Sequence, residues 1–178
     1  MRAFTIPELL ISIFIIVLMT AIAVPIWRSG ETTLALDRAA HKLSQDIRKA
    51  TELAQRAQAL VLPLTCAPGK ISGYGIYVSA AMPTSTYTLY AECNGNQTYE
   101  LGVDAVFQTV TLENKIQITS TSVTPSSFAI LFVPPVPTIT IQSGMESLAQ
   151  AQITLSIAGD PSRSKIITVT NKGIIDID

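Results

Sequence analysis

A run of apolar residues near the amino terminus constrains this chain more than any other feature. No charged residue occurs from Leu9 to Trp27, and as a helix rising about 1.5 Å per residue these 19 residues reach roughly 28 Å. The hydrocarbon core of a bilayer is ~30 Å thick, so the run is long enough to span a membrane. Arg2 precedes it, and the positive-inside rule then places the chain after Trp27 on the extracytoplasmic side.

The composition excludes several classes of protein. The 178 residues are 48% hydrophobic and only 14% charged, and the mean hydropathy of +0.39 reflects the apolar run. The net charge of −1 argues against a chain-wide basic surface for nucleic acid. The chain has two cysteines and one histidine, His41, which we expect to be solvated on the polar side of a helix. Two cysteines and one histidine form no zinc motif, and a solvated His41 leaves no histidine for a Ser–His–Asp triad, so we expect no catalytic, metal or cofactor site.

Glu8 lies at the entry to the apolar run, and two interpretations of the run differ over its role. In one, the run is a secretory signal peptide with Ala21-Ile22-Ala23 as its cleavage site, and the mature chain begins at Val24. Glu8 has no use in such a peptide. A carboxylate within lipid costs about 2.5–3.5 kcal/mol at the centre and less near the edge, so the second interpretation gives Glu8 a function and a partner.

The residues around Glu8 resemble the start of type IV prepilins and pseudopilins. The stretch Phe4-Thr5-Ile6-Pro7-Glu8-Leu9-Leu10-Ile11-Ser12 is similar to the motif that prepilin peptidase cuts before the Phe, which is then N-methylated. The resemblance implies cleavage between Ala3 and Phe4, with residues 1–3 as the leader, and it places Glu8 and Pro25 at positions typical of the family. The sequence departs from the family at Ala3, where Gly is usual, and at Pro7, where Ile is usual.

The two prolines are expected to act differently. Pro7 falls in the first turn, where backbone N–H groups have no intrahelical acceptor, although it disfavours a helical Ile6 and predicts an irregular start. Pro25 lies inside the predicted helix and removes the hydrogen bond to the Ala21 carbonyl. We therefore expect the helix to kink or to melt locally at Pro25.

Beyond Arg28 the pattern becomes that of an amphipathic helix. Apolar residues recur at intervals of four and three, which predicts one buried stripe: Leu36, Ala40, Leu43, Ile47, Ala50, Ala54, Ala57 and Val61. Charged residues, Asp46 among them, fall on the other faces. We expect one helix from Phe4 to about Leu62, ended by Pro63, with residues 4–27 as the membrane and assembly half and residues 28–62 as the amphipathic half.

Residues 63–178 are expected to form a β-rich head. Short alternating segments separated by turn residues predict eight strands: 74–79, 86–92, 105–112, 115–120, 127–133, 138–142, 151–158 and 165–170. Asn94-Gly95-Asn96 and Asn171-Lys172-Gly173 are candidate hairpin turns. The fold class is therefore α+β, a long amino-terminal helix packed on an antiparallel β domain, as in pilins.

The head also resembles the GspH/FimT class of minor pilins. The similar segments are Leu43–Ala59 of the helix, the Gly73-Tyr74-Gly75 run, and the final residues 166–177 as a hairpin. The chain departs from the class after Gly173, where Gly-Arg-Ile is usual. Cys66 and Cys93 are alone and exported, which favours a disulfide worth about 3 kcal/mol for a 27-residue loop in the chain-entropy model.

The resemblance implies a minor pilin or pseudopilin of the bacterial inner membrane. Its partners would be other pilin or pseudopilin subunits, the prepilin peptidase and N-methyltransferase, the inner-membrane assembly platform, and lipid before assembly. Glu8 would form a salt bridge with the free amino terminus of an adjacent mature subunit.

Two alternatives stay open. One is a pilin-like subunit that binds DNA during uptake, although residues 63–178 carry five basic against eight acidic residues and the one basic cluster is Arg163–Lys172. The other is a secreted β-domain adhesin or enzyme with a cleaved signal peptide.

Overall fold

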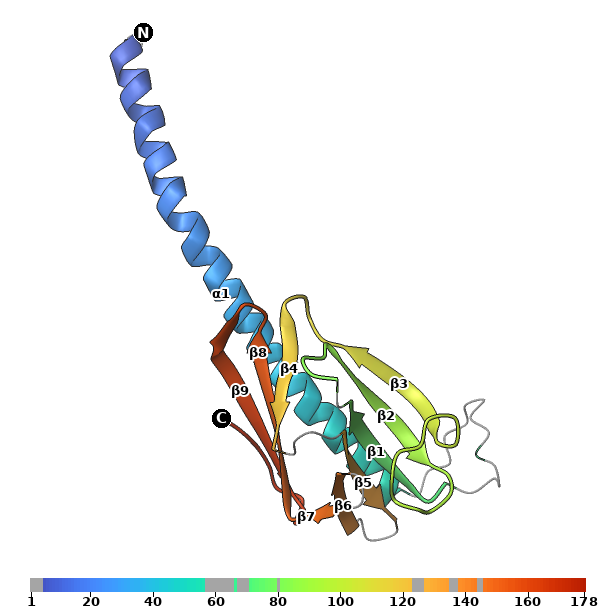
Figure 1. Ribbon diagram of the computed structural model, residues 1–178. Helices are drawn as coiled ribbons and strands as arrows, with labels where there is room; N and C mark the ends of the chain where they lie inside the picture. The colour runs from blue at the N-terminus through green and yellow to red at the C-terminus, as the bar shows by residue number, and fades with distance from the viewer. Residues whose placement is uncertain are drawn as a thin grey trace.

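The chain folds into a long amino-terminal helix and a β-rich head, an α+β arrangement (Figure 1). The computed structural model describes residues 5–56, 66, 71–79, 81–122, 127–134, 138–143 and 146–178. Helix α1 spans Ile6–Gln55, and its first half stands clear of the head while its second half runs along the β-sheets. The predicted helical segment between residue 57 and Leu62 lies outside the described residues.

The described strands form two antiparallel sheets, one on either side of the second half of α1. One sheet has six strands in the order β3-β2-β1-β5-β6-β7, and the other has four in the order β10-β9-β8-β4. Helix α1 contacts β1 and β5 of the first sheet and β4, β8, β9 and β10 of the second. The strands are β1 Gly73–Val78, β2 Thr86–Glu92, β3 Ala105–Thr111, β4 Ile116–Thr121, β5 Phe128–Val133, β6 Thr138–Ser143, β7 Glu146–Leu148, β8 Gln150–Ile157, β9 Asp160–Thr170 and β10 Ile175–Ile177.

The buried stripe of α1 explains why the helix lies against the sheets. The predicted stripe is confirmed at all six positions that the structure describes: Leu36, Ala40, Leu43, Ile47, Ala50 and Ala54 are each at most 3% exposed. Three of these six residues are alanines, and such small side chains let the helix backbone approach the inner faces of both sheets. Ala57 and Val61, the last two predicted members, lie outside the described residues.

The prediction was wrong for Asp46, which the pattern places on a solvated face. Asp46 is only 3% exposed, and its carboxylate has two partners, one on β2 and one on α1. Tyr87 of β2 donates a hydrogen bond to Oδ2, and Lys42 contacts Oδ1 at 2.9 Å. A buried charge that is fully hydrogen-bonded in this way avoids much of its desolvation cost.

Further polar contacts fix α1 to both sheets. The Arg38 guanidinium forms a two-pronged contact with Glu113 at 2.9 and 2.7 Å, just beyond β3. On the other side, Arg163 of β9 donates to Thr33 Oγ1 at 3.1 Å, and Lys165 lies 3.9 Å from Asp37. The head is therefore attached to α1 from about residue 33 onward.

All eight predicted strands are confirmed, with differences at their ends. β9 begins at Asp160, earlier than predicted. The short strand β7 was not predicted, because three residues show no alternation. β10 is the second strand of the hairpin that the resemblance implied for residues 166–177. The Asn171-Lys172-Gly173 turn does join β9 to β10, with Gly173 at φ 87°. Asn94-Gly95-Asn96 is not a tight hairpin turn, because it begins a long connection from β2 to β3.

Candidate functional site

Helix α1 begins at a capping arrangement built from Thr5 and Glu8. Thr5 has an extended backbone, and Glu8 reaches back so that its Oε2 accepts hydrogen bonds from the Thr5 N–H at 3.0 Å and the Thr5 hydroxyl at 2.8 Å. Pro7 occupies the second helical position, where its missing N–H costs no helical bond. The predicted irregular first turn is wrong, since the helix starts at Ile6 and the Leu9 N–H bonds to the Thr5 carbonyl.

The first half of α1 is an uncovered apolar rod. The segment Ile6–Val24 has a mean hydropathy of 2.5, and none of it is buried by the rest of the chain. By length and composition it can cross a membrane. Figure 1 shows this half extending away from both sheets. Glu8 is the acid at its start, and among the described residues its carboxylate has Thr5 as its hydrogen-bond partner.

The helix does not break at Pro25. α1 is continuous from Ile6 to Gln55, and Figure 1 shows a smooth curve along it. The predicted local melting is therefore wrong. Pro25 cannot donate to the Ala21 carbonyl, but the hydrogen bonds of the adjacent turns keep the helix continuous. The continuous backbone couples the direction of the apolar half to that of the head.

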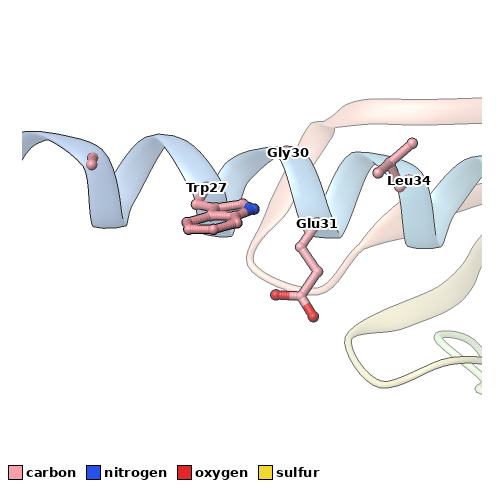
Figure 2. Close-up of a pocket in the computed structure, with 5 residues that line it drawn as sticks. Trp27, Gly30, Glu31 and Leu34 are labelled. Atoms are coloured by element: carbon pink, nitrogen blue, oxygen red, sulfur yellow. The ribbon is translucent and has the colours of Figure 1, made fainter.

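A second uncovered group lies just beyond the apolar span, where α1 approaches the head. Ala23, Trp27, Gly30, Glu31 and Leu34 line a shallow hollow of about 600 Å³ along one side of the helix (Figure 2). Trp27 is 81% exposed and Leu34 is 59% exposed. Figure 2 shows the Trp27 ring and the Glu31 carboxylate projecting from adjacent turns. We call these five residues the neck surface.

The neck surface was not predicted from the sequence. Its signal was present, because Ala23, Trp27, Gly30 and Leu34 follow one another at intervals of four, three and four, the spacing of a single helix face. This face continues that of Leu9, Ile13, Ile16 and Thr20 in the apolar span. Exposed apolar faces of this kind mark sites of contact with lipid or with another protein.

The two cysteines are joined, as the sequence analysis expected. Cys66, between α1 and β1, forms a disulfide with Cys93, the residue that follows β2, and their Cα atoms are 5.1 Å apart. Cys93 also donates its backbone N–H to Asp104 Oδ1 at 3.1 Å. The disulfide therefore ties the segment after the helix to the start of the β2–β3 connection.

The Gly73-Tyr74-Gly75 run has a structural reason. Tyr74 points inward and is 1% exposed, whereas Gly75 faces outward under the ring of Tyr90 on the neighbouring strand. A Cβ at Gly75 would lie 2.7 Å from both the Tyr90 ring and the Ile130 carbonyl oxygen. A side chain at this position is therefore excluded by both neighbouring strands.

The remaining predicted residues lie as follows. His41 is exposed on α1, as predicted. Within the basic segment Arg163–Lys172, Arg163 pairs with Asp160 at 2.8 Å and Lys165 lies near Asp37. Ala3 and Phe4, the predicted cleavage site, lie outside the described residues. Across the part of the chain that the structure describes, no group of three or more His, Cys, Asp or Glu is placed to hold a metal ion.

The features of the site thus gather on α1: an acid at its start, an apolar span, and an exposed neck surface joined by continuous helix to a β-rich head. Comparison of the chain with protein-family models, with curated proteins and with solved structures returned no match.

Proposed function

We propose that this chain is a minor pilin or pseudopilin of the GspH/FimT type. It is held in the bacterial inner membrane by a single span, with its head on the extracytoplasmic side, and it assembles through α1 into a type IV pilus or a type II secretion pseudopilus, in initiation or at the tip. The observation that carries this proposal is that one continuous helix, Ile6–Gln55, is the core of the head at one end and uncovered at the other.

An uncovered apolar rod needs another surface to cover it. Lipid covers Ile6–Val24 before assembly, and the helices of neighbouring subunits replace lipid afterwards. Leu34 lies ten residues beyond Val24, about 15 Å along the helix, and the headgroup layer adds only ~5–7 Å to each side of the hydrocarbon. A protein partner therefore suits the far end of the neck surface better than lipid does.

The proposed pairing of Glu8 with another subunit belongs to the assembled state. When the helix moves from lipid into a bundle of helices, an unpaired carboxylate would be buried at a cost of several kcal/mol. The free amino terminus that cleavage creates on a neighbouring mature subunit is a cation at the right end of the helix to pair with it. This pairing sets the axial position of one subunit against the next.

The signal-peptide alternative is less well supported. Cleavage after Ala23 would cut α1 where its backbone is continuous helix and would remove the span that precedes the head. A DNA-binding role is also less well supported, since Arg163 and Lys165 are occupied by Asp160 and Asp37.

Amino-terminal sequencing of the mature membrane-bound protein tests the proposal. We expect a chain beginning with N-methylated Phe4, and a chain beginning at Val24 would refute it. The variant Ala3→Asp places a charge before the cut and should leave unprocessed precursor in the membrane. The matched control Ala3→Gly should be processed at least as fast as the wild type.

A further inference from the structure

The connection between β2 and β3, residues 93–104, covers the outer face of the six-stranded sheet. Tyr99 of this cover loop packs against Tyr77 with ring centres 4.1 Å apart and against Tyr90 at 4.9 Å. Tyr90 and Leu131, on the face that points away from α1, are fully buried. The cover loop therefore closes over a small aromatic and apolar cluster that is separate from the main core.

Two carboxylates hold the cover loop in place through backbone N–H groups. Asp104 accepts from the Cys93 N–H at 3.1 Å and from the Glu100 N–H at 2.7 Å, one on each oxygen. Glu92, at the end of β2, accepts from the Asn94 and Gly95 N–H groups at 3.1 and 2.9 Å, both on Oε1. Asp104 is 6% exposed and Glu92 is fully buried.

The other oxygen of Glu92 has no partner among the described residues. Glu92 Oε2 is buried without a hydrogen bond, and so is the hydroxyl of Tyr90 two residues earlier on the same face of β2. The adjacent strand β1 places Gly73 opposite Glu92. Among the described residues, the titratable groups that interact with Glu92, or with its neighbours Tyr90 and Asp104, are acidic or phenolic: Tyr90 from β2, and Tyr99, Glu100 and Asp104 from the cover loop.

We propose that Glu92 takes up a proton when the cover loop closes, so that the loop is closed most firmly in acid and opens more readily as the pH rises. A protonated Oε2 carries no charge into this buried site, so the desolvation cost of an ionised carboxylate is avoided. Deprotonation of Glu92 leaves two charged carboxylates, Glu92 and Asp104, holding the same loop. No Lys, Arg or His of the described residues forms an ion pair with either of them.

The direction of the effect follows from the two pKa values. Burial raises the pKa of Glu92, and the negative charge of Asp104 raises it further. Burial also raises the pKa of Asp104. Glu92 therefore binds its proton more tightly in the closed state than in the open state. Its contribution to closure is complete at pH values below the ordinary pKa, and it is lost as the pH rises through the raised pKa of the closed state. Opening of the loop would expose Tyr77, Tyr90 and Leu131.

Hydrogen exchange of backbone amides in the full-length protein in detergent tests the proposal. The readout is the protection of the Cys93 and Glu100 N–H groups, relative to their intrinsic exchange rates, from pH 4.5 to 7.5. We expect protection to fall by up to tenfold per pH unit between the open-state and closed-state pKa values of Glu92. The variant Glu92→Gln should flatten this dependence, whereas the control Glu146→Gln, at an exposed acid on β7, should keep it.

Two results would overturn the proposal: protection in the wild type that does not change with pH, or a fall of equal size in Glu92→Gln. If Glu92→Gln does not fold, the carbon-13 shift of the Glu92 carboxyl in the wild type gives the answer directly. A titration midpoint of this carboxyl above the ordinary Glu pKa of about 4.3 supports proton uptake on closure. A titration midpoint at or below that pKa refutes the proposal.

Discussion

The hydroxyl of Tyr87 donates a 2.6 Å hydrogen bond to Oδ2 of Asp46, and this contact joins the first sheet to helix α1 inside the head. Both residues are buried, at 1% and 3% exposure. Burial raises the pKa of Tyr87 far above its ordinary value, and the Asp46 carboxylate raises it further, so the hydroxyl keeps its proton. Lys42 supplies the compensating positive charge on the solvent side of Asp46.

The first prediction removes this hydrogen bond. Tyr87→Phe leaves Asp46 Oδ2 buried without its partner, so we expect the free energy of unfolding to fall by about 1–3 kcal/mol, measured by urea denaturation in detergent. Tyr77→Phe is the matched control, because the described residues provide no hydrogen-bond partner for its hydroxyl. Equal stability of the two variants would contradict the role given to the Tyr87–Asp46 contact.

Asp46 also marks the limit of what periodicity can predict. The spacing of Leu36, Leu43 and Ile47 fixes which face of α1 is buried, because apolar residues at intervals of three and four form one stripe. Asp46 precedes Ile47 and lies at the edge of that stripe. Its burial depends on Tyr87, 41 residues away, and a pairing over that distance leaves no trace in the local pattern of the helix.

The second prediction concerns two glycines in different surroundings. Gly75→Ala would force a Cβ against the Tyr90 ring and the Ile130 carbonyl oxygen, so we expect a loss of about 1–3 kcal/mol in the free energy of unfolding. Gly30→Ala meets no atom within 4 Å and should favour the helix by about 0.5–1 kcal/mol. The same substitution therefore has opposite signs at the two sites, as thermal unfolding of each variant would show.

The glycine run illustrates how far a motif alone can be interpreted. The resemblance pointed to Gly73-Tyr74-Gly75 as a characteristic segment, and alternation predicted a strand there. Neither gives the reason for Gly75, because the atoms that exclude a side chain belong to Tyr90 and Ile130 on the two neighbouring strands. The neck surface escaped detection differently: Leu34 belongs to an apolar face that the head leaves uncovered, and a sequence pattern does not distinguish covered from uncovered faces.

The third prediction concerns the Cys66–Cys93 disulfide. It closes a loop of 27 residues, so reduction should lower the free energy of unfolding by about 3 kcal/mol through the greater entropy of the open unfolded chain. Because Cys93 begins the cover loop, its amide and that of Glu100 should also lose protection. The double variant Cys66→Ala, Cys93→Ala should match the reduced wild type and should not respond to reductant. A response in that variant would contradict the assignment.

The last prediction separates membrane insertion from assembly and rests on the proposed function. Glu8→Val makes the span more apolar, so insertion should be unchanged or improved. Processing should continue, because Ala3, Phe4 and Arg2 are untouched. The head should remain folded, since the Thr5–Glu8 contact lies at the far end of α1 from the buried stripe. What is lost is the partner for the amino terminus of a neighbouring subunit.

We therefore expect Glu8→Val to accumulate in the membrane as mature monomer and to be missing from filaments. Cell fractionation followed by immunoblotting of membranes and sheared filaments measures both pools. Glu52→Val makes the same substitution at an exposed acid on the half of α1 that joins the head, and it should assemble normally. Undiminished incorporation of Glu8→Val would refute the salt bridge while leaving membrane anchoring intact. Loss of both variants from filaments would show instead that assembly responds to any lost acid on α1.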